Sequence, residues 1–397
     1  MAERADDSDK RESIATSLIH HPYEPPQGFA APQPGVHKAS TVIFANSAAM
    51  RSRHWQSKSG YTYGLHGTPT SFMLEARIAT LEGGTHTLLL PSGLAAIALV
   101  DMALLKSGDE LLIPDNAYGP SKELARNELA GWGIKHRLYD AMDPQSLIDA
   151  ITPATKLVWV EAPGSVTMEF PDLRALIEAA RSRGITTAID NTWGAGIAYD
   201  PFALGVDISM HALTKYPSGG GDVLMGSVTT RDAALQRRLS RAHMHLGQGV
   251  GANDVEALLR ALPTLPLRYE AQDRAGRALA QWWAQRAEVV QVLHPALPSS
   301  PGHEQWRALC RSAAGLFSVV FDERYTQAQV DAFVDALKLF KIGYSWAGPV
   351  SLVVSYDVAM IRSKPAWRGQ LVRFSVGLEA VDDLIADCAQ ALRVLGA

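Results

Sequence analysis

Cysteine is scarce in this sequence, and its scarcity limits the possible folds. The 397 residues include two cysteines, Cys310 and Cys388. Two cysteines are too few for a disulfide framework, so small disulfide-stabilised folds are excluded. A protein that does not depend on disulfides is expected in a reducing compartment, and we therefore predict a cytoplasmic protein.

Long apolar runs are missing as well. The longest, residues 93–105 (GLAAIALVDMALL), contains Asp101 and is too short to cross a bilayer. The opening residues, MAERADDSDKRES, are charged and have no apolar centre, so we expect neither a signal peptide nor a membrane anchor there. We expect a soluble protein with a disordered N-terminal tail.

Neither sign of charge is in large excess. Lys and Arg number 37 and Asp and Glu 41, which gives a net charge of −4, and the basic residues are scattered. A nucleic-acid partner is therefore not expected. The 47% of hydrophobic and 20% of charged residues are typical of a globular protein, and the length predicts two domains.

The residue pattern divides the chain into three stretches. Residues 1–60 combine the tail with a segment rich in Pro, Gly, Ser and Gln, which predicts an extended arm. Residues 61–265 alternate short apolar runs with helical patterns, which predicts a mostly parallel α/β sheet covered on both faces. Residues 266–397 predict a smaller α+β domain. The expected strands of the larger domain are 85–91, 110–114, 155–161, 185–190, 206–211 and 222–228, and its expected helices are 93–105, 120–132, 172–184 and 232–244; a long helical stretch over 268–293 is expected to open the smaller domain.

Three polar positions follow predicted strands of the larger domain. Ser92-Gly93 leads into a helix, whose free N–H groups suit a phosphate, Asp190 ends an apolar run, and Lys215 precedes three glycines. Taken singly, each has an ordinary explanation as a helix cap, a turn acid or a surface lysine. Together they are what a pyridoxal phosphate enzyme needs at the carboxyl edge of a sheet, because lysine forms the Schiff base and the acid keeps the pyridine nitrogen protonated.

Two other motifs are weaker. Residues 246–254 (LGQGVGAND) resemble a dinucleotide-binding loop, but they follow a helical pattern and do not match G-x-G-x-x-G. His243 and His245 form an H-x-H pair without a nearby acid or cysteine, so we expect exposed helix histidines and no metal site.

Motifs in order along almost the whole chain resemble one enzyme family. They are YTYGLHGTPTSFMLEARIATLEGG, PSGLAAI, DNAYGPS, VEAPGSVTMEFPD, IDNTWGAG and HALTKYPSGGGDVLMGS. Each is similar to a signature of the pyridoxal phosphate enzymes of cysteine and methionine metabolism. The resemblance implies the fold of aspartate aminotransferase (fold type I) and a homotetramer made of two active dimers.

The resemblance also implies roles for single residues at the cofactor. Lys215 would form the Schiff base with pyridoxal 5'-phosphate and later transfer protons, and Asp190 would pair with the pyridinium nitrogen. Tyr118 would stack on the cofactor ring. The implied phosphate ligands are the backbone N–H groups of Gly93 and Leu94, the hydroxyl of Thr214 and, from the neighbouring subunit, Tyr63.

Further roles concern the substrate. Arg373 would clamp its carboxylate through a bidentate pair, with Ser351 beside that carboxylate and Trp346 near the substrate. Protons would pass through Lys215 and a tyrosine, either Tyr118 or Tyr63.

Within the family, the agreements favour the bacterial cystathionine β-lyases. Residues 294–306, 343–348 and 376–387 resemble that branch, and Pro120 and Ser165 replace residues typical of γ-specific members. The implied reaction cleaves L-cystathionine to homocysteine, pyruvate and ammonia. The open alternatives are a γ-synthase or γ-lyase, a lyase acting broadly on cystine or cysteine S-conjugates, and a cofactor-binding regulator that has lost catalysis.

Two positions depart from the family pattern. An arginine is usual where Leu65 stands, and His66 is the nearest candidate substitute for its contact with the phosphate. Ala212 stands where several relatives have a phosphate-binding serine. We expect weaker cofactor retention from the loss of a charge-assisted hydrogen bond worth about 1.5–3 kcal/mol.

Overall fold

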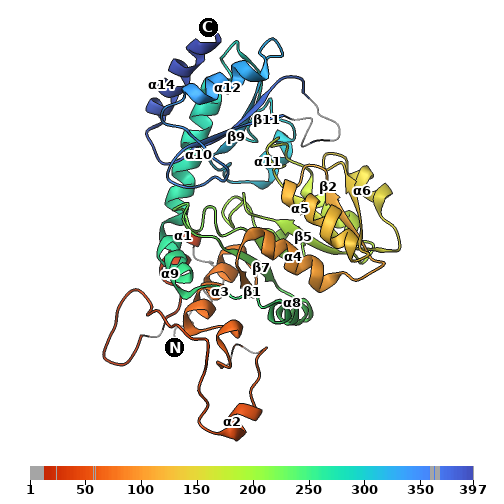
Figure 1. Ribbon diagram of the computed structural model, residues 1–397, viewed down its shortest axis with the longest axis vertical. Coiled ribbons are helices and arrows are strands. Elements are labelled where there is room, and N and C mark those ends of the chain that lie inside the picture. Colours follow the sequence, from red (N-terminus) through yellow and green to blue (C-terminus); the bar gives the residue numbers. More distant parts are fainter. Residues whose placement is uncertain are drawn as a thin grey trace, which may run out of the picture.

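A computed structural model describes residues 13–23, 25–56, 58, 60–357, 362 and 367–396. The predicted disordered tail, apart from Ser13, lies outside these residues. The described chain forms an elongated molecule with a five-stranded sheet at one end, a seven-stranded sheet in the middle and an extended arm at the other end (Figure 1).

The seven-stranded sheet is mostly parallel, as predicted. Its strand order is β1-β7-β6-β5-β4-β2-β3, and β7 runs antiparallel to both of its neighbours. The carboxyl ends of the parallel strands therefore meet along one edge. The strands are β1 (His86–Leu90), β2 (Glu110–Pro114), β3 (Lys135–Tyr139), β4 (Thr155–Glu161), β5 (Thr186–Asp190), β6 (Ile208–His211) and β7 (Gly226–Thr230).

Helices cover both faces of this sheet, and alternate side chains of β4 pack against the helices on opposite faces. Leu157 and Trp159 belong to one apolar cluster, whereas Val158 and Val160 belong to the other. Alternate side chains of a strand point to opposite faces, so a strand between two helical layers is apolar throughout. The helices of this part are α3 (Pro69–Glu82), α4 (Gly93–Leu104), α5 (Gly119–Leu124), α6 (Pro144–Ala150), α7 (Leu173–Arg181), α8 (Ala233–Leu246) and α9 (Ala252–Ala261), with short turns η1 (Gly64–His66), η2 (Ala125–Leu129), η3 (Phe202–Leu204) and η4 (Leu262–Thr264).

Several local features differ from expectation. Strand β3 was not predicted, because KHRLY at the sheet edge is mostly exposed and has too few apolar residues to show a strand pattern. Strand β7 begins at Gly226 rather than at Asp222. His243 is buried, and its Nε2 lies 3.1 Å from the carbonyl oxygen of Leu89, so it is not an exposed histidine.

The second sheet is smaller and mainly antiparallel, with the order β10-β11-β12-β9-β8. The helix expected over 268–293 ends early, and its last residues, VVQVL, form a strand instead because β-branched residues favour a sheet. The elements are α10 (Leu265–Trp283), β8 (Val289–Leu293), α11 (His303–Leu309), β9 (Leu316–Phe321), α12 (Gln327–Ala336), β10 (Lys341–Ile342), β11 (Leu352–Tyr356), β12 (Leu371–Ser375), α14 (Val381–Leu392) and η5 (Arg393–Leu395).

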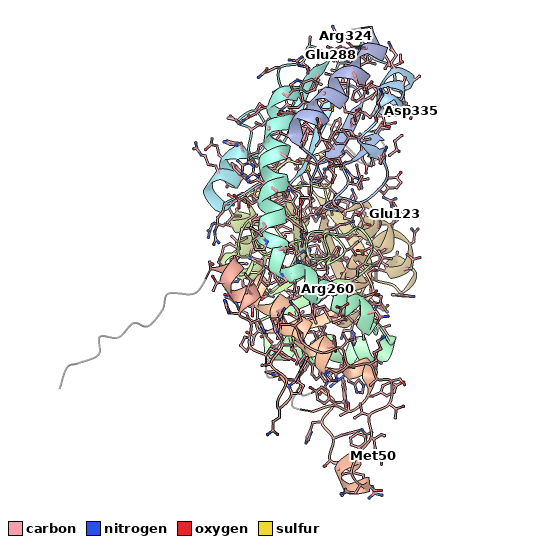
Figure 2. The ribbon with its side chains drawn as sticks, turned by 90° about the vertical axis from the view of Figure 1, so that its left-hand side faces the viewer. Met50, Glu123, Arg260, Glu288, Arg324 and Asp335 are labelled. Atoms are coloured by element: carbon pink, nitrogen blue, oxygen red, sulfur yellow. The ribbon has the colours of Figure 1, made fainter. Side chains whose placement is uncertain are left out.

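Helix α10 connects the two apolar cores. Its first turns place Leu265 and Tyr269 in the core beneath the seven-stranded sheet, and its last turns place Leu279 and Trp283 in the core of the five-stranded sheet. Figure 2 shows the helix running along the side of both parts. The predicted limits of the two domains, 61–265 and 266–397, stay a prediction.

The arm contains α1 (Ile14–Ile19), which packs near α3, and α2 (Ser47–Arg51), which includes Met50 and lies at the far tip of the arm (Figure 2). Large apolar side chains such as Phe29, Ile43 and Met50 are exposed along it, and Ile43 is 92% exposed. Among the described residues, no helix is both long enough and apolar enough to cross a membrane.

Candidate active site

The carboxyl edge of the seven-stranded sheet carries two acids side by side. Glu161 ends β4, Asp190 ends β5, and the two residues are direct partners in the strand register. Strand β6 ends at His211, and the next four residues lead to Lys215. Parallel strands direct their ends to a common ligand site, so these three groups share one location.

The amine of Lys215 faces the C-terminal sheet. Its Nζ donates a hydrogen bond of 2.7 Å to Oγ of Ser345 and lies 5.5 Å from the centre of the Trp346 ring. Burial, followed by the nearby guanidinium of Arg373, lowers the pKa of this amine to about 8. A larger share of the lysine is therefore neutral, and hence nucleophilic, near physiological pH than for an ordinary lysine.

Both acids are disfavoured as anions. Burial raises the pKa of Asp190, although Thr192 lowers it by donating its N–H to Oδ1 at 3.0 Å. Burial and then the neighbouring Asp190 raise the pKa of Glu161 to about 8. A cationic ring nitrogen placed beside Asp190 would remove this penalty.

The N-terminus of α4 lies against Ala212, three residues before Lys215. Ser92 caps the helix by accepting the N–H of Ala95, which leaves the N–H groups of Gly93 and Leu94 as the first of the helix. A Cβ at position 93 would lie 2.6 Å from Cβ of Ala212, so only glycine permits this close approach. Thr214 follows Ala212 by two residues, and its hydroxyl exchanges hydrogen bonds with the backbone of Met225.

Arg373 comes from β12 of the second sheet and is only 7% exposed. Its Nη2 donates to the carbonyl of Ser345 at 3.1 Å, and the guanidinium lies 5.5 Å from the centre of the Tyr356 ring. Its Nε has no hydrogen-bond partner within the described part of the chain. A buried guanidinium with a spare donor is suited to a carboxylate ligand.

Ser351 was expected beside the same carboxylate. The structure shows its hydroxyl donating to Glu379 at 2.7 Å and accepting the N–H of Gly377 at 2.9 Å. Its role toward a substrate stays a prediction.

The two candidate tyrosines lie in different places. Tyr118 precedes α5 after β2, at the same sheet edge as Glu161, and it is 43% exposed. Tyr63 lies close to the arm, forms a bridge with Thr41 and lies 6.0 Å from the ring of His66. Its contact with the cofactor of a neighbouring subunit stays a prediction.

Leu65 and His66 line a cavity of about 580 Å³ together with Lys38 and Lys58. Nδ1 of His66 bonds Thr62 at 2.8 Å, and burial, then the charges of His243 and Arg53, lower the pKa of His66. A neutral imidazole is a poor replacement for a guanidinium as a phosphate ligand.

Three residues of this region carry no sequence signal that predicts a place in the site. Ser345 lies in residues 343–348, where the resemblance implies a role for Trp346 alone, and Glu161 is predicted only as the last residue of a strand. Arg362 had no motif at all, yet it is buried and ion-paired with Glu169.

These residues fit pyridoxal phosphate. A lysine of lowered pKa, an acid at a strand end and a helix N-terminus that tolerates no side chain at its first residue supply the amine, the ring partner and the phosphate donors.

Comparison with known proteins agrees with this fit. The model of the family described as Cys/Met metabolism PLP-dependent enzymes matches residues 15–393. A cystathionine β-lyase of Bordetella avium is 38% identical over 97% of this chain and 99% of its own length, and an L-methionine γ-lyase of Pseudomonas putida is 32% identical over 97% and 98%. The structure of a cystathionine γ-synthase from Xanthomonas oryzae pv. oryzae has a TM-score of 0.89 at 30% identity and covers 97% of this chain and 99% of that one. The chain therefore belongs to the pyridoxal phosphate-dependent enzymes of cysteine and methionine metabolism, which have fold type I.

Proposed function

We propose that this protein is a carbon–sulfur β-lyase that cleaves L-cystathionine to homocysteine, pyruvate and ammonia. The observation that carries the proposal is the restrained amine of Lys215, held by Ser345 Oγ at 2.7 Å and by the Trp346 ring. A β-elimination needs one base that takes the α-proton and an acid close by for the leaving sulfur. A γ-elimination also requires proton removal at the β-carbon, so it demands more travel from the lysine.

The cofactor would be held by the residues at the sheet edge. Lys215 would bind it covalently, Asp190 would face its ring nitrogen, and Tyr118 would stack on its ring. Its phosphate would meet the N–H groups of Gly93 and Leu94 and the hydroxyl of Thr214. When bound, pyridoxal phosphate supplies an electron sink for the negative charge that develops at the α-carbon of the substrate.

Arg373 orients the substrate. Its guanidinium, positioned by the Ser345 carbonyl and the Tyr356 ring, binds the α-carboxylate and fixes which face of the α-carbon the lysine meets. Once the amino group of the substrate has replaced Lys215 on the cofactor, the freed Lys215 Nζ would take the α-proton. Burial and then Asp190 raise the pKa of Tyr118, so its hydroxyl keeps its proton at neutral pH and can donate it to the leaving sulfur.

The relatives support the β-reaction without deciding it. A protein named cystathionine β-lyase has the higher identity, 38%, but one named L-methionine γ-lyase still reaches 32%. A γ-reaction is therefore the second candidate. Wider action on cystine or cysteine S-conjugates also follows from the same mechanism.

A product assay tests the proposal. Purified protein loaded with pyridoxal phosphate is incubated with L-cystathionine, and pyruvate, 2-oxobutyrate, homocysteine and cysteine are quantified together. We expect pyruvate and homocysteine in equal amounts. 2-Oxobutyrate with cysteine would instead establish a γ-lyase, and the absence of all four products would contradict the β-lyase.

Ser345→Ala provides a second readout for the restraint on Lys215. If the serine confines the lysine, this variant loses β-elimination by about 10-fold, the effect of losing one hydrogen bond to a charged group. Wild-type rates in Ser345→Ala would show that the restraint does not serve catalysis.

We further propose that Tyr63 acts on the site of a second copy. A mixture of Tyr63→Phe and Lys215→Ala proteins would then form hybrid dimers in which one of the two sites is intact. Random exchange would restore about a quarter of the wild-type activity, because half of the dimers are hybrids. Failure of the mixture to exceed the two separate variants would exclude a shared site. The homotetramer stays a prediction.

A further inference from the structure

Tyr118 is 43% exposed, so side-chain packing alone does not fix its ring. Its residue stands at the N-cap of α5, which has no side-chain cap, and the backbone there leaves β2 and turns into the helix. The N–H of Tyr118 donates to Oε2 of Glu161 at 2.8 Å. This bond is the direct polar link between Tyr118 and the body of the sheet.

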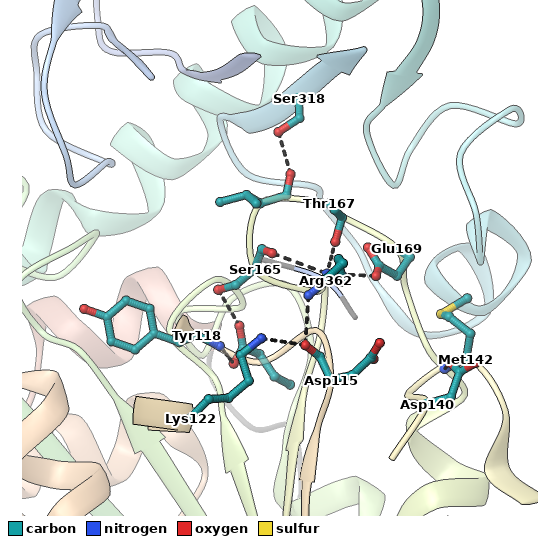
Figure 3. A network of polar contacts seen from close by, with 12 residues as sticks. Asp115, Tyr118, Lys122, Asp140, Met142, Ser165, Thr167, Glu169, Ser318 and Arg362 are labelled. Carbon is teal, nitrogen blue, oxygen red and sulfur yellow. Dashed lines mark hydrogen bonds and ion pairs between the residues drawn. The ribbon is translucent and has the colours of Figure 1, made fainter. Parts of the chain in front are cut away.

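Glu161 is itself well fixed. It is the last residue of β4, the register partner of Asp190, and its Oε1 accepts the hydroxyl of Ser165 at 2.7 Å. One carboxyl group therefore connects the strand that carries Asp190 with the turn that carries Tyr118. Figure 3 shows this turn and the loop of Ser165 facing each other.

We propose that Glu161 is a positioning residue, which holds the backbone N–H of Tyr118 so that the tyrosine ring stays parallel to the cofactor. The inference rests on the proposed stacking role of Tyr118. It assigns to Glu161 no contact with the cofactor or the substrate.

Arg362 holds the other end of the same turn. Its Nη1 donates to the carbonyl of Asp115 at 3.0 Å, and Nη2 donates to Glu169 at 2.9 Å and to Thr167, with the Ser165 carbonyl at 3.4 Å (Figure 3). Arg362 lies between β11 and β12 of the second sheet. The turn of residues 115–118 is therefore clamped at Asp115 by Arg362 and at Tyr118 by Glu161.

The charge state of Glu161 suits this role. Burial first, then Asp190, raises its pKa to about 8, against hydrogen bonds from Tyr118 and Ser165 and the charge of Arg362. A neutral carboxyl group still accepts the N–H of Tyr118 and leaves Asp190 as the single anion of the pair. Glutamine, which is neutral and of the same shape, should therefore replace Glu161 well.

The test uses the cofactor-loaded protein and three variants. The dissociation constant of pyridoxal phosphate and the visible circular dichroism of the bound cofactor, which reports how it is held, are measured for Glu161→Ala, Glu161→Gln and the control Glu110→Ala. Glu110 is a buried acid at the opposite edge of the same sheet, so its loss tests general destabilisation. We expect Glu161→Ala to raise the dissociation constant about 10-fold and to change the dichroism, with Glu161→Gln within about 2-fold of wild type. Glu110→Ala should melt at a lower temperature and keep both signals.

A double-mutant cycle separates this inference from the role of Tyr118. If Glu161 acts through the tyrosine, adding Glu161→Ala to Tyr118→Ala changes the dissociation constant by less than about 2-fold. An unchanged constant in Tyr118→Ala alone would refute the stacking role. The positioning role would be overturned if Glu161→Ala kept the wild-type dissociation constant while Tyr118→Ala raised it. It would also be overturned if Glu161→Ala and Glu161→Gln raised the constant equally. If Glu161→Ala does not fold, Glu161→Leu, which has similar size and no acceptor, takes its place.

Discussion

Glu110 and Glu161 lie at opposite ends of the parallel strands of the seven-stranded sheet, and the pKa values of their carboxyl groups are shifted in opposite directions. At the amino edge, Glu110 accepts two hydrogen bonds from Arg137, at 3.0 and 2.9 Å, and one each from Thr152 and Thr155. Burial acts to raise the pKa of Glu110, but these partners lower it overall. At the carboxyl edge, Glu161 faces another acid, and its pKa is raised to about 8.

The two edges therefore differ in whether their acids stabilise the folded chain. Acids at the amino edge have cationic or hydroxyl partners and stabilise the folded chain. Acids at the carboxyl edge lie side by side, with a lysine whose own pKa is lowered, and such clusters mark functional sites more often than structural ones. Each prediction below exchanges or removes a group on one edge and asks whether activity or stability responds.

The largest effect is expected for the lysines of the two edges. Lys215→Ala should lower turnover of L-cystathionine by more than about 1,000-fold, because it removes both the covalent attachment of the cofactor and the base. Lys156→Ala, which alters an exposed lysine at the amino end of β4, is the control and should keep wild-type turnover. Substantial turnover in the Lys215→Ala protein would remove this residue from the mechanism.

Replacing an acid at the amino edge should lower the stability of the folded chain. Replacing an acid at the carboxyl edge should lower turnover instead. Glu110→Gln is expected to lower the free energy of unfolding by about 2 kcal/mol, because Arg137 loses its charged partner. Asp190→Asn should leave that free energy unchanged or raise it in the cofactor-free protein. In the cofactor-loaded protein, the same substitution should abolish most activity. Urea unfolding of both variants measures the contrast, and equal destabilisation would erase the distinction between the edges.

Glu161 should give the stability a distinctive pH dependence. Its folded-state pKa is raised, so between its unfolded value of about 4.3 and about 8 the folded state binds more protons than the unfolded state, and stability falls as the pH rises. Compared with wild type, cofactor-free Glu161→Gln should become increasingly more stable as the pH rises from 4 to 8, and it should not differ from wild type below pH 4. A difference that does not change with pH would show that Glu161 ionises normally.

The smallest effect is expected at Leu65. Leu65→Arg restores a guanidinium two residues after Tyr63 and should tighten pyridoxal phosphate binding about 10-fold, since a charge-assisted hydrogen bond to phosphate is gained. Leu65→Gln, which adds polarity without charge, is the matched control. If both variants bind the cofactor like wild type, the side chain at position 65 does not reach the phosphate.

The features that were predicted best are those that depend on residues close together in the sequence. Asp190 and Lys215 follow apolar runs that had to be buried strands, so their place at the carboxyl edge followed from the strand pattern alone. Glu161 stood in a predicted strand too, but its importance comes from Asp190 on the adjacent strand, and strand adjacency is not written in a local pattern. Arg362 was beyond reach for the same reason, because its partners Asp115 and Glu169 are distant in the chain.

Errors in the fold have similar physical causes. Strand β3 was not predicted because an edge strand needs few apolar residues. Strand β8 was predicted as part of a helix because its short apolar run follows α10 closely in the sequence. The antiparallel direction of β7 depends on how its connection returns across the sheet. None of these follows from residue type or spacing.

Helix α10 has a consequence for how the molecule melts. Because Tyr269 belongs to one apolar core and Trp283 to the other, neither core can come apart without disturbing a helix that the other still needs. Tyr269 also donates to the carbonyl of Trp193, and Arg268 donates to that of Tyr216, the residue after Lys215. The two sheets should therefore denature together as one calorimetric transition, and the lysine should lose its place in the same event.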